Sequence, residues 1–456
     1  VVSRARQAGI RFTPKQLFQH QTVQGLAGVA RSEVESPLQA QGPVTGPTPL
    51  LPFQQVFFDT QIPQRHHWNQ SVLLKPREPL QAGLLAQALE RLLEQHDALR
   101  TRFVAEDGQW RATLAAPEAG CAEHLLWQVE GADAAELQAH YQRAQTSLDL
   151  GAGPLLRAVL ARMGEEQRVL LVIHHLAVDG VSWRILLEDL QTLYRQLAAG
   201  QVPVLPAKTC SVQAWAERLQ AHAGSAQLRE ELGYWQAQLQ GVNAELPRDR
   251  ALASANSRQA HTVHTRLDSG LTRQLLQEAP SAYRTQVNDL LLTALARVIA
   301  RWTGESSVLV QLEGHGREEL FEDTDLVRSV GWFTSLFPAR LDVQEDLAAS
   351  IKQVKEQLRG IPDKGLGYAT LRYLGDEASR AALAGLAQPR LTFNYLGQFD
   401  GSFAEQDDTL FTPSGEARGA EQSADAPLGN WLTINGHVYG GELSLGWTFS
   451  TEQFDV

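Results

Sequence analysis

The sequence has few cysteines and no long apolar run. Cys121 and Cys210 are the only two cysteines among 456 residues, which is too few for a disulfide framework, and their spacing matches no metal-binding motif. This usage agrees with a reducing cytoplasm, the location that we expect. No uninterrupted apolar stretch is long enough to span a bilayer, and residues 1–6 lack the apolar core of a signal peptide. We therefore expect neither a disulfide-rich secreted protein nor a membrane partner.

Basic charge is also scarce. The 40 basic and 52 acidic side chains give a net charge of −12, and no basic run stands out, so we do not expect a nucleic-acid partner. An apolar content of 43% with 7% aromatic residues is ordinary for a soluble globular protein. The sequence has no initiator methionine and ends abruptly at residues 454–456, so we expect a piece of a longer chain.

The first 49 residues divide into a small unit and a linker. Thr13 and Pro14 fit an N-cap and first helical position, and residues 21–30 predict a second short helix. Because residues 1–35 are too few to bury a core, we interpret them as the C-terminal tail of an upstream domain. Residues 36–49 are predicted to be a linker, because prolines and glycines are dense there, at Pro37, Gly42, Pro43, Gly46, Pro47 and Pro49.

The remaining sequence predicts two α/β cycles. In the first, the apolar run 168–173 predicts a buried strand before a helix at 184–198. In the second, an apolar helix at 287–302 precedes a buried strand at 307–312. Each half places a buried strand before its most polar motif, which predicts two similar lobes, 50–210 and 211–456, with a ligand site between them. Further strands are expected at 68–74, 101–103, 110–114, 155–160, 262–267, 333–341, 391–395 and 443–449, and helices at 80–99, 134–144, 211–239 and 271–277.

Two histidines lie on the turn after the strand 168–173. Adjacent residues of a strand point to opposite faces, so one of His174 and His175 can face the core and the other a cavity. A neutral imidazole near pH 7 suits a general base, although a lone histidine at a strand end is more often structural. Asp179 follows closely enough to orient an imidazole or to hold the turn through an ion pair. No third ligand at zinc spacing accompanies them, so no metal site is expected.

Two further polar stretches follow predicted strands. Glu313 begins the sequence Glu-Gly-His-Gly-Arg-Glu, where an apolar pocket would raise the pKa of its carboxyl; the alternative is a solvated charged loop. Asn394 and Tyr395 follow another strand and could donate to a developing oxyanion, or Tyr395 could cap the core with its hydroxyl in water. The pair His66 and His67 is interpreted as part of an aromatic strand edge.

Taken together, five stretches resemble the epimerization domain of nonribosomal peptide synthetases, within the condensation-domain superfamily. Residues 174–183 fit the superfamily HHxxxDG motif, which by itself indicates only the superfamily. The other four fit epimerization motifs and make the assignment specific: EGHGRE at 313–318, VGWFT from Val330, PxxGxGY at 362–368 and FNYLG at 393–397. The first thirty or so residues resemble the last helix region of a peptidyl carrier protein, whose phosphopantetheine-bearing serine is not in this sequence.

The resemblance implies an α/β fold of two chloramphenicol-acetyltransferase-like lobes, arranged as a V-shaped pseudo-dimer with the active-site tunnel between them. It implies inversion, L to D, at Cα of an aminoacyl or peptidyl thioester in nonribosomal peptide biosynthesis, such as that of an antibiotic or siderophore. The substrate would arrive on the 4'-phosphopantetheine arm of the upstream carrier protein of the same synthetase, beside its other modules. No cofactor bound by the domain itself is expected. Which amino acid is inverted stays open.

By position in the motifs, His175 and Glu313 are the two facing acid/base groups, and either could remove the L-proton. Asn394 and Tyr395 are expected near the thioester oxygen or the proton path. His174 and Asp179 are expected to support the turn, with Asp179 paired to Arg100 or Arg102. The residues expected to line the substrate or pantetheine tunnel are Ser182, Trp183, Trp332, Thr334 and Ser335.

Two rival functions fit parts of the same pattern. A condensation domain would use His175 to form an amide between two carrier-bound substrates, but the stretches at 313–318 and 393–397 argue against it. A non-catalytic module that only docks the carrier would not need His175 and Glu313, and both are present.

Overall fold

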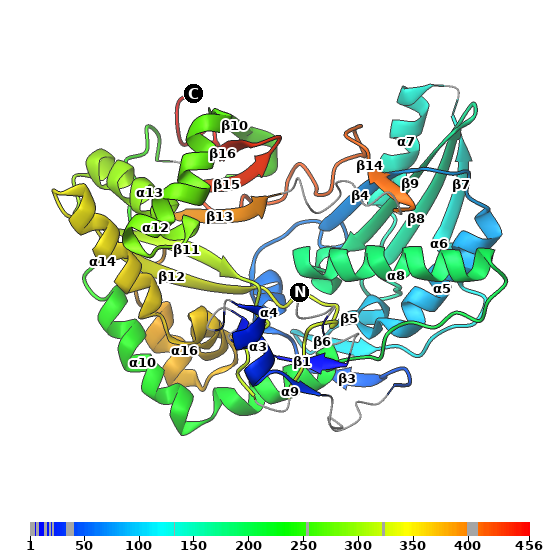
Figure 1. The fold of residues 1–456 in the computed structure, drawn as a ribbon, viewed down its shortest axis with the longest axis horizontal. Helices are drawn as coiled ribbons and strands as arrows, with labels where there is room; N and C mark the ends of the chain where they lie inside the picture. Colours follow the sequence, from blue (N-terminus) through cyan, green and yellow to red (C-terminus); the bar gives the residue numbers. More distant parts are fainter. Residues whose placement is uncertain are drawn as a thin grey trace.

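The chain folds into two α/β lobes, each built on one large sheet, which diverge like the arms of a V (Figure 1). This computed structural model describes residues 5, 9–12, 16–17, 20, 22–32, 41–131, 133–251, 255–321, 324–398 and 409–456. The predicted two-lobed α/β organisation is confirmed. Among these residues, none of the helices combines the length and the apolar character needed to cross a membrane.

The N-terminal lobe has a five-stranded sheet with helices on both faces. Strand β9 is buried along nearly all its length because its side chains enter two cores in alternation. Val169, Leu171 and Ile173 join one core, whereas Leu170 and Val172 join the other. The strand order is β14-β4-β9-β8-β7, with strands β4 Asn69–Pro76, β7 Leu126–Glu130, β8 Leu156–Met163, β9 Glu166–His174 and β14 Phe411–Pro413, and helices α5 Ala82–Gln95, α6 Ala122–Leu125, α7 Ala134–Gln145 and α8 Gly180–Ala198.

The C-terminal lobe has a six-stranded mixed sheet packed against a second large core. Helix α13 contributes a buried apolar face that includes Leu292, Leu295 and Ile299. The strand order is β10-β16-β15-β13-β11-β12, with strands β10 Ala260–Leu267, β11 Ser307–Gly314, β12 Ser335–Asp342, β13 Leu391–Gln398, β15 Leu432–Tyr439 and β16 Glu442–Ser450, and helices α10 Ala226–Leu239, α11 Ser269–Arg273, α12 Ala279–Tyr283, α13 Val287–Thr303, α14 Leu347–Arg359, α15 Leu366–Ala369 and α16 Glu377–Ala384.

Segments from both halves of the chain meet between the lobes. Helix α4 (Pro52–Asp59), from the N-terminal half, contacts β12 of the C-terminal sheet. Helix α9 (Val212–Ala223) packs Trp215 into a small core shared with Phe333. Strand β14 leaves the C-terminal half and pairs antiparallel with β4 of the N-terminal sheet. The predicted boundary, which gave all of 211–456 to the C-terminal lobe, is therefore wrong for this crossing segment, because an edge strand accepts a partner from any part of the chain.

The predicted linker is also partly wrong. Residues 46–48 form strand β3 (Gly46–Thr48), which pairs with β6 (Gln109–Leu114). In this three-stranded sheet, completed by β5 (Thr101–Glu106), β3 is an edge strand. An edge position tolerates Pro47, which lacks the N–H that a central strand needs. Residues 36–40 of the linker lie outside the described residues.

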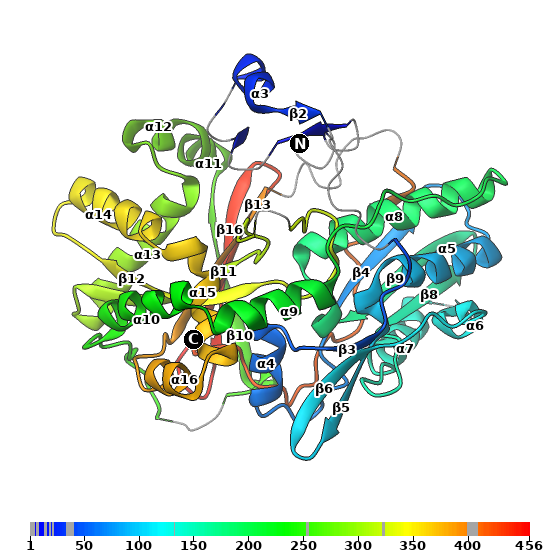
Figure 2. The same ribbon diagram turned by 90° about the horizontal axis from the view of Figure 1, so that it is seen from below.

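The N-terminal unit sits at the periphery (Figure 2). The predicted helix at 21–30 is confirmed as α3 (Val23–Val29), which Thr22 caps through Gly25 N–H at 3.0 Å. No residue of α3 is buried, and the short strands β1 (Ile10–Arg11) and β2 (Arg31–Ser32) pair beside it. The predicted start of the first helix at Thr13 and Pro14 lies outside the described residues.

Other predicted elements differ in detail. The helical stretch 211–239 is two helices, α9 and α10, because Gly224 ends the first and the Ser225 side chain caps the second. The elements that were not predicted include β7, helix α14 and the central strand β15. In β15 the apolar alternation of Leu432 and Ile434 is interrupted by Gly436, which weakens the strand pattern in sequence.

Candidate active site

The first motif lies where β9 ends and α8 begins. A single 3-10 turn (His175–Ala177) carries the chain from the strand to Asp179, the N-cap of α8. The Asp179 carboxylate accepts a hydrogen bond from Ser182 N–H at 2.9 Å, which satisfies one of the unpaired N–H groups of the first helical turn. The cap fixes the direction in which the helix leaves the turn, and with it the orientation of both histidines.

His174 is wholly buried. Its Nε2–H donates to the Arg65 carbonyl at 2.7 Å, and its Nδ1 accepts from Leu176 N–H at 3.2 Å. Burial lowers the pKa of His174 to about 3, so the ring is neutral at pH 7 with both nitrogens engaged. This is the position expected of a residue that supports the turn.

His175 points the other way and stays partly exposed. Its Nδ1 lies 2.9 Å from the Val178 carbonyl, which can only accept, so the proton is on Nδ1 and Nε2 carries the lone pair. The Trp332 ring stacks on the imidazole with centroids 4.0 Å apart. Burial lowers the pKa of His175, which favours the neutral ring that a general base requires.

Gln70 contacts this lone pair and was not among the predicted site residues. Its amide nitrogen lies 2.9 Å from His175 Nε2, and its amide oxygen accepts from Trp183 Nε1–H at 2.9 Å. The only sequence signal was a polar residue on a strand whose neighbours are buried, which is too general to single it out.

The predicted partner of Asp179 was wrong. Asp179 pairs with Arg317, whose two terminal nitrogens reach its carboxylate oxygens at 2.7 and 3.0 Å. Arg100 instead bonds to Asp97 at 2.7 Å, and Arg102 is exposed on β5. The error arose because the sequence search stayed within the N-terminal half, whereas Arg317 belongs to the polar stretch after β11.

Ser182 completes the junction around this ion pair. Its hydroxyl donates to Gly331 O at 3.0 Å and accepts from Arg317 at 3.0 Å, and it is wholly buried. The Phe333 N–H donates to Asp179 at 3.0 Å. These internal contacts place Ser182 within the junction, which corrects its expected position on a tunnel wall.

Glu313 lies at the end of β11 in the C-terminal sheet. Strands β11 and β13 are parallel neighbours in the register Leu312 to Phe393, which brings Asn394 beside Glu313. The Asn394 amide donates to the Glu313 carboxylate at 3.2 Å. Burial raises the pKa of Glu313, yet its side chain is accessible to solvent. A carboxyl that is both accessible and partly desolvated lies in a recess, so the solvated-loop alternative does not describe it.

Tyr395 does not share this position. Because neighbouring residues of a strand face opposite sides, Tyr395 points away from Asn394 and packs against the core of the C-terminal lobe. Burial raises the pKa of its hydroxyl. This placement matches the alternative in which Tyr395 caps the core, and a role in the proton path stays a prediction.

The other predicted tunnel residues are mostly enclosed. Trp332 stacks between His175 and Phe53, with 4.0 Å between centroids on each side. Trp183 is 9% and Ser335 3% exposed, and Thr334 is half-buried. Their contribution to a tunnel stays a prediction.

The histidine pair and the metal question are quickly described. His66 Nδ1 accepts from Leu150 N–H at 3.0 Å, and His67 contacts the Ala420 carbonyl at 2.6 Å, so both rings bond to backbone. Within the described part of the chain, no group of three or more histidine, cysteine, aspartate or glutamate side chains is arranged to hold a metal ion.

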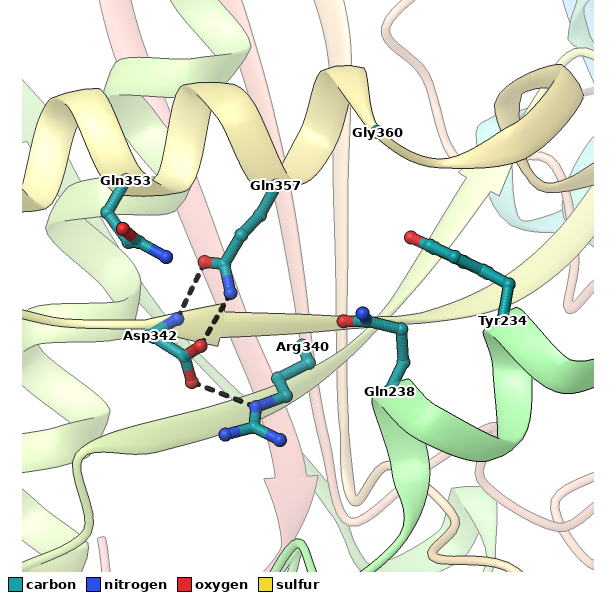
Figure 3. Close-up of a pocket in the computed structure, with 7 residues that line it drawn as sticks. All are labelled: Tyr234, Gln238, Arg340, Asp342, Gln353, Gln357 and Gly360. Carbon is teal, nitrogen blue, oxygen red and sulfur yellow. Dashed lines mark hydrogen bonds and ion pairs between the residues drawn. The ribbon is translucent and has the colours of Figure 1, made fainter.

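A separate pocket of about 430 Å³ opens between α10, β12 and α14 (Figure 3). Its polar side chains bond to one another: Gln357 spans the Asp342 backbone and carboxylate at 2.8 and 2.7 Å, and Arg340 reaches the same carboxylate at 2.9 Å. None of the predicted site residues lines it, so it is distinct from the candidate active site.

Comparison with known proteins adds independent findings. Residues 44–456 match the Condensation domain family. A linear gramicidin synthase of Brevibacillus parabrevis is 44% identical over 465 residues, covering 99% of this chain and 6% of the synthase. Surfactin synthase subunit 1 of Bacillus subtilis (strain 168) is 40% identical, covering 100% of this chain and 13% of the synthase. The chain thus spans a small part of either relative.

A solved structure is similar along nearly its whole length. The crystal structure of the epimerization domain from the third module of tyrocidine synthetase B is 36% identical, with a TM-score of 0.83. The match covers 92% of this chain and 94% of that one. This likeness confirms the predicted condensation-superfamily fold of two chloramphenicol-acetyltransferase-like lobes.

Proposed function

Because the chain belongs to the condensation-domain family, we propose that it is an epimerization domain of a nonribosomal peptide synthetase. It inverts Cα, L to D, of an aminoacyl or peptidyl thioester held on the phosphopantetheine arm of a carrier protein. The 36% identity to an epimerization domain of tyrocidine synthetase B supports this choice within the family.

The observation that carries the proposal is a second acid/base group on the other lobe. Peptide-bond formation needs one base, whereas inversion needs a proton removed from one face of Cα and delivered to the other. His175 from the N-terminal lobe offers a neutral imidazole, and Glu313 from the C-terminal lobe offers a carboxyl whose pKa is raised by burial. One group is thus suited to accept a proton while the other is suited to give one.

The proton balance of inversion follows from these two states. His175 takes the Cα proton, and the electron pair of the broken C–H bond passes to the thioester oxygen. The Glu313 carboxyl then delivers its proton to the opposite face of Cα, and the C=O bond re-forms. The enzyme is left with an imidazolium and a carboxylate, which exchange with solvent protons to restore the first state. In the reverse direction the two groups exchange roles, and stereospecific labelling decides which of them removes the L-proton.

Solvent deuterium exchange at Cα of a substrate-loaded carrier tests this mechanism. We expect His175→Ala and Glu313→Gln each to slow deuterium incorporation by about 10²- to 10⁴-fold, the usual contribution of a positioned acid or base. His264→Ala and Glu442→Gln are the matched controls, because both residues are exposed on the C-terminal sheet. Full exchange in either site variant would remove that residue from the mechanism.

The condensation alternative has one observation in its favour, since the family carries the description "Condensation domain". A product assay with donor and acceptor carriers separates the two reactions, because condensation yields a new amide and epimerization an inverted thioester. A carrier-docking module without catalysis would bind the loaded carrier and leave its Cα proton unexchanged.

A further inference from the structure

A chain of three side chains, Trp183, Gln70 and His175, has an orientation that its own chemistry determines. An indole nitrogen is only a donor, so the Gln70 amide atom 2.9 Å from Trp183 Nε1 must be oxygen. The Gln70 NH₂ group therefore faces His175 Nε2 at 2.9 Å and donates to it. At the far side of the ring, His175 Nδ1 must donate to the Val178 carbonyl. Both ends of the chain impose the same tautomer.

This arrangement opposes protonation of His175. An added proton on Nε2 would face the Gln70 NH₂ group, which loses a hydrogen bond and sets donor against donor. Rotation of the amide by half a turn would relieve His175, but it would set NH₂ against the Trp183 N–H instead. Trp183 is 9% exposed, so water has little room to replace the lost bond.

We propose that Gln70, locked in orientation by Trp183, is a positioning residue that holds His175 in its neutral form with the lone pair on Nε2. The amide covers this lone pair while the site is empty, and it moves aside when the nitrogen accepts a proton. This inference rests on the proposed function only in treating His175 as the base; the protonation state itself is tested independently.

The charges around His175 set the background for this effect. Asp179, at the start of α8, and Glu421, on the crossing segment after β14, both favour the imidazolium. Each carboxylate has a cationic partner, Arg317 at 2.7 Å and Arg418 at 3.2 Å respectively. Trp332 on the ring face and His174 before the ring complete the surroundings, and His174 is neutral at pH 7. Gln70 lies in direct contact with Nε2, so changes to its polarity act on the proton itself.

The decisive variant is Gln70→Glu. A carboxylate in this position accepts from Trp183 and from a protonated Nε2, so it favours the imidazolium. We expect the pKa of His175 to rise by about one to three units, the usual effect of an adjacent opposite charge. Deuterium exchange at neutral pH should fall and recover at higher pH, with the profile displaced by the same amount. Gln128→Glu, an exposed change of equal charge on β7, should leave the profile in place.

Trp183→Phe tests the lock without adding a charge. With the indole N–H removed, the Gln70 amide is free to turn its oxygen toward Nε2, and the pKa of His175 should rise by about one unit, from the hydrogen bond that the charged form gains. Trp447→Phe is the matched control, since Trp447 Nε1–H donates to Thr265 at 2.9 Å in the other lobe. An unchanged pKa of His175 in both Gln70→Glu and Trp183→Phe would overturn the proposal.

Nitrogen-15 histidine NMR reads the state directly. Two-bond correlations should show wild-type His175, assigned by its absence in His175→Ala, protonated at Nδ1. Protonation at Nε2 instead would contradict the inference. If the NMR result is as expected but the wild-type protein exchanges no Cα proton, the proposed function fails and the positioning role stands. If Gln70→Glu does not fold, Gln70→Met and Trp183→Phe provide the same comparison.

Discussion

Replacing Arg317 by methionine should weaken the connection between the two halves of the candidate site. Arg317 follows Glu313 by four residues and Asp179 follows His175 by four, so their ion pair joins the turn of one acid/base group to the loop of the other. The pair is enclosed, with side chains 7% and 4% exposed, and the guanidinium lies 4.4 Å from the centre of the Phe333 ring. Methionine retains most of the apolar volume of arginine and removes the charge and its hydrogen bonds.

The magnitude follows from what Asp179 keeps. Breaking a buried ion pair by removing one partner costs about 3–5 kcal/mol. Asp179 still accepts from Ser182 N–H, the Ser182 hydroxyl and Phe333 N–H, so we expect the lower end, about 3 kcal/mol. The double variant Asp179→Asn/Arg317→Met removes both charges and should recover at least about 1 kcal/mol of this loss.

Urea unfolding followed by tryptophan fluorescence measures the change in the free energy of unfolding. Cα deuterium exchange measures the site, and a shift of about 1 Å between the two groups should slow it about 10²-fold. The matched control is Arg258→Met, because Arg258 pairs with Asp425 at 2.7 Å but the side chains are 62% and 48% exposed. Such a surface pair contributes about 1 kcal/mol or less. If Arg317→Met is no less stable than this control and exchanges normally, the pair does not hold the site together.

Three further results are expected. Gly316→Ala should cost about 3 kcal/mol or more in urea unfolding, because Gly316 has φ +67° and a Cβ would lie 1.5 Å from the Phe333 carbonyl oxygen. Between pH 6.5 and 5 the free energy of unfolding should fall by about 2 kcal/mol, at about 1.4 kcal/mol per pH unit. The reason is that His174, with a folded pKa of about 3, takes up a proton in the unfolded chain first. Asn394→Ala removes the donor to the Glu313 carboxylate, so the pKa of Glu313 should rise further and its limb of the exchange profile should move to higher pH.

Each of these has a control. Gly429→Ala, where a Cβ meets open space, should stay within about 0.5 kcal/mol of the wild type, and equal stability of the two alanine variants would refute the steric reasoning. The pH slope should disappear in His174→Gln, and a wild-type stability that is flat from pH 6.5 to 5 would show that His174 is not held neutral. An unchanged profile in Asn394→Ala would mean that the amide does not tune Glu313.

The local signals of the sequence were sufficient for many elements. The apolar run of β9 and the helical period of α5 and α13 predicted their positions, because burial on one face or on both imposes a pattern on the chain. The turn at His174 and His175 could likewise be located, since a buried strand and an amphipathic helix bracket it. Glu313 and Asn394 could each be placed at a strand end for the same reason.

Partners across long separations were decided by the tertiary structure. Asp179 and Arg317 are 138 residues apart, and Gln70 and His175 are 105 apart. Neither local propensity nor periodicity specifies which strand will lie beside another, so the sequence suggested Arg100 or Arg102 for Asp179 and gave no reason to choose Gln70. The three-residue strand β14 was missed for the same reason, since its only support is the edge of a distant sheet.

The sequence by itself determined which residues carry the chemistry and that each of the two acid/base groups follows a buried strand. Only the packing of the lobes decided their states, because protonation depends on what surrounds a group in three dimensions. Burial makes His174 a neutral support, Gln70 and Val178 fix the tautomer of His175, and the register of β11 and β13 brings Asn394 to Glu313.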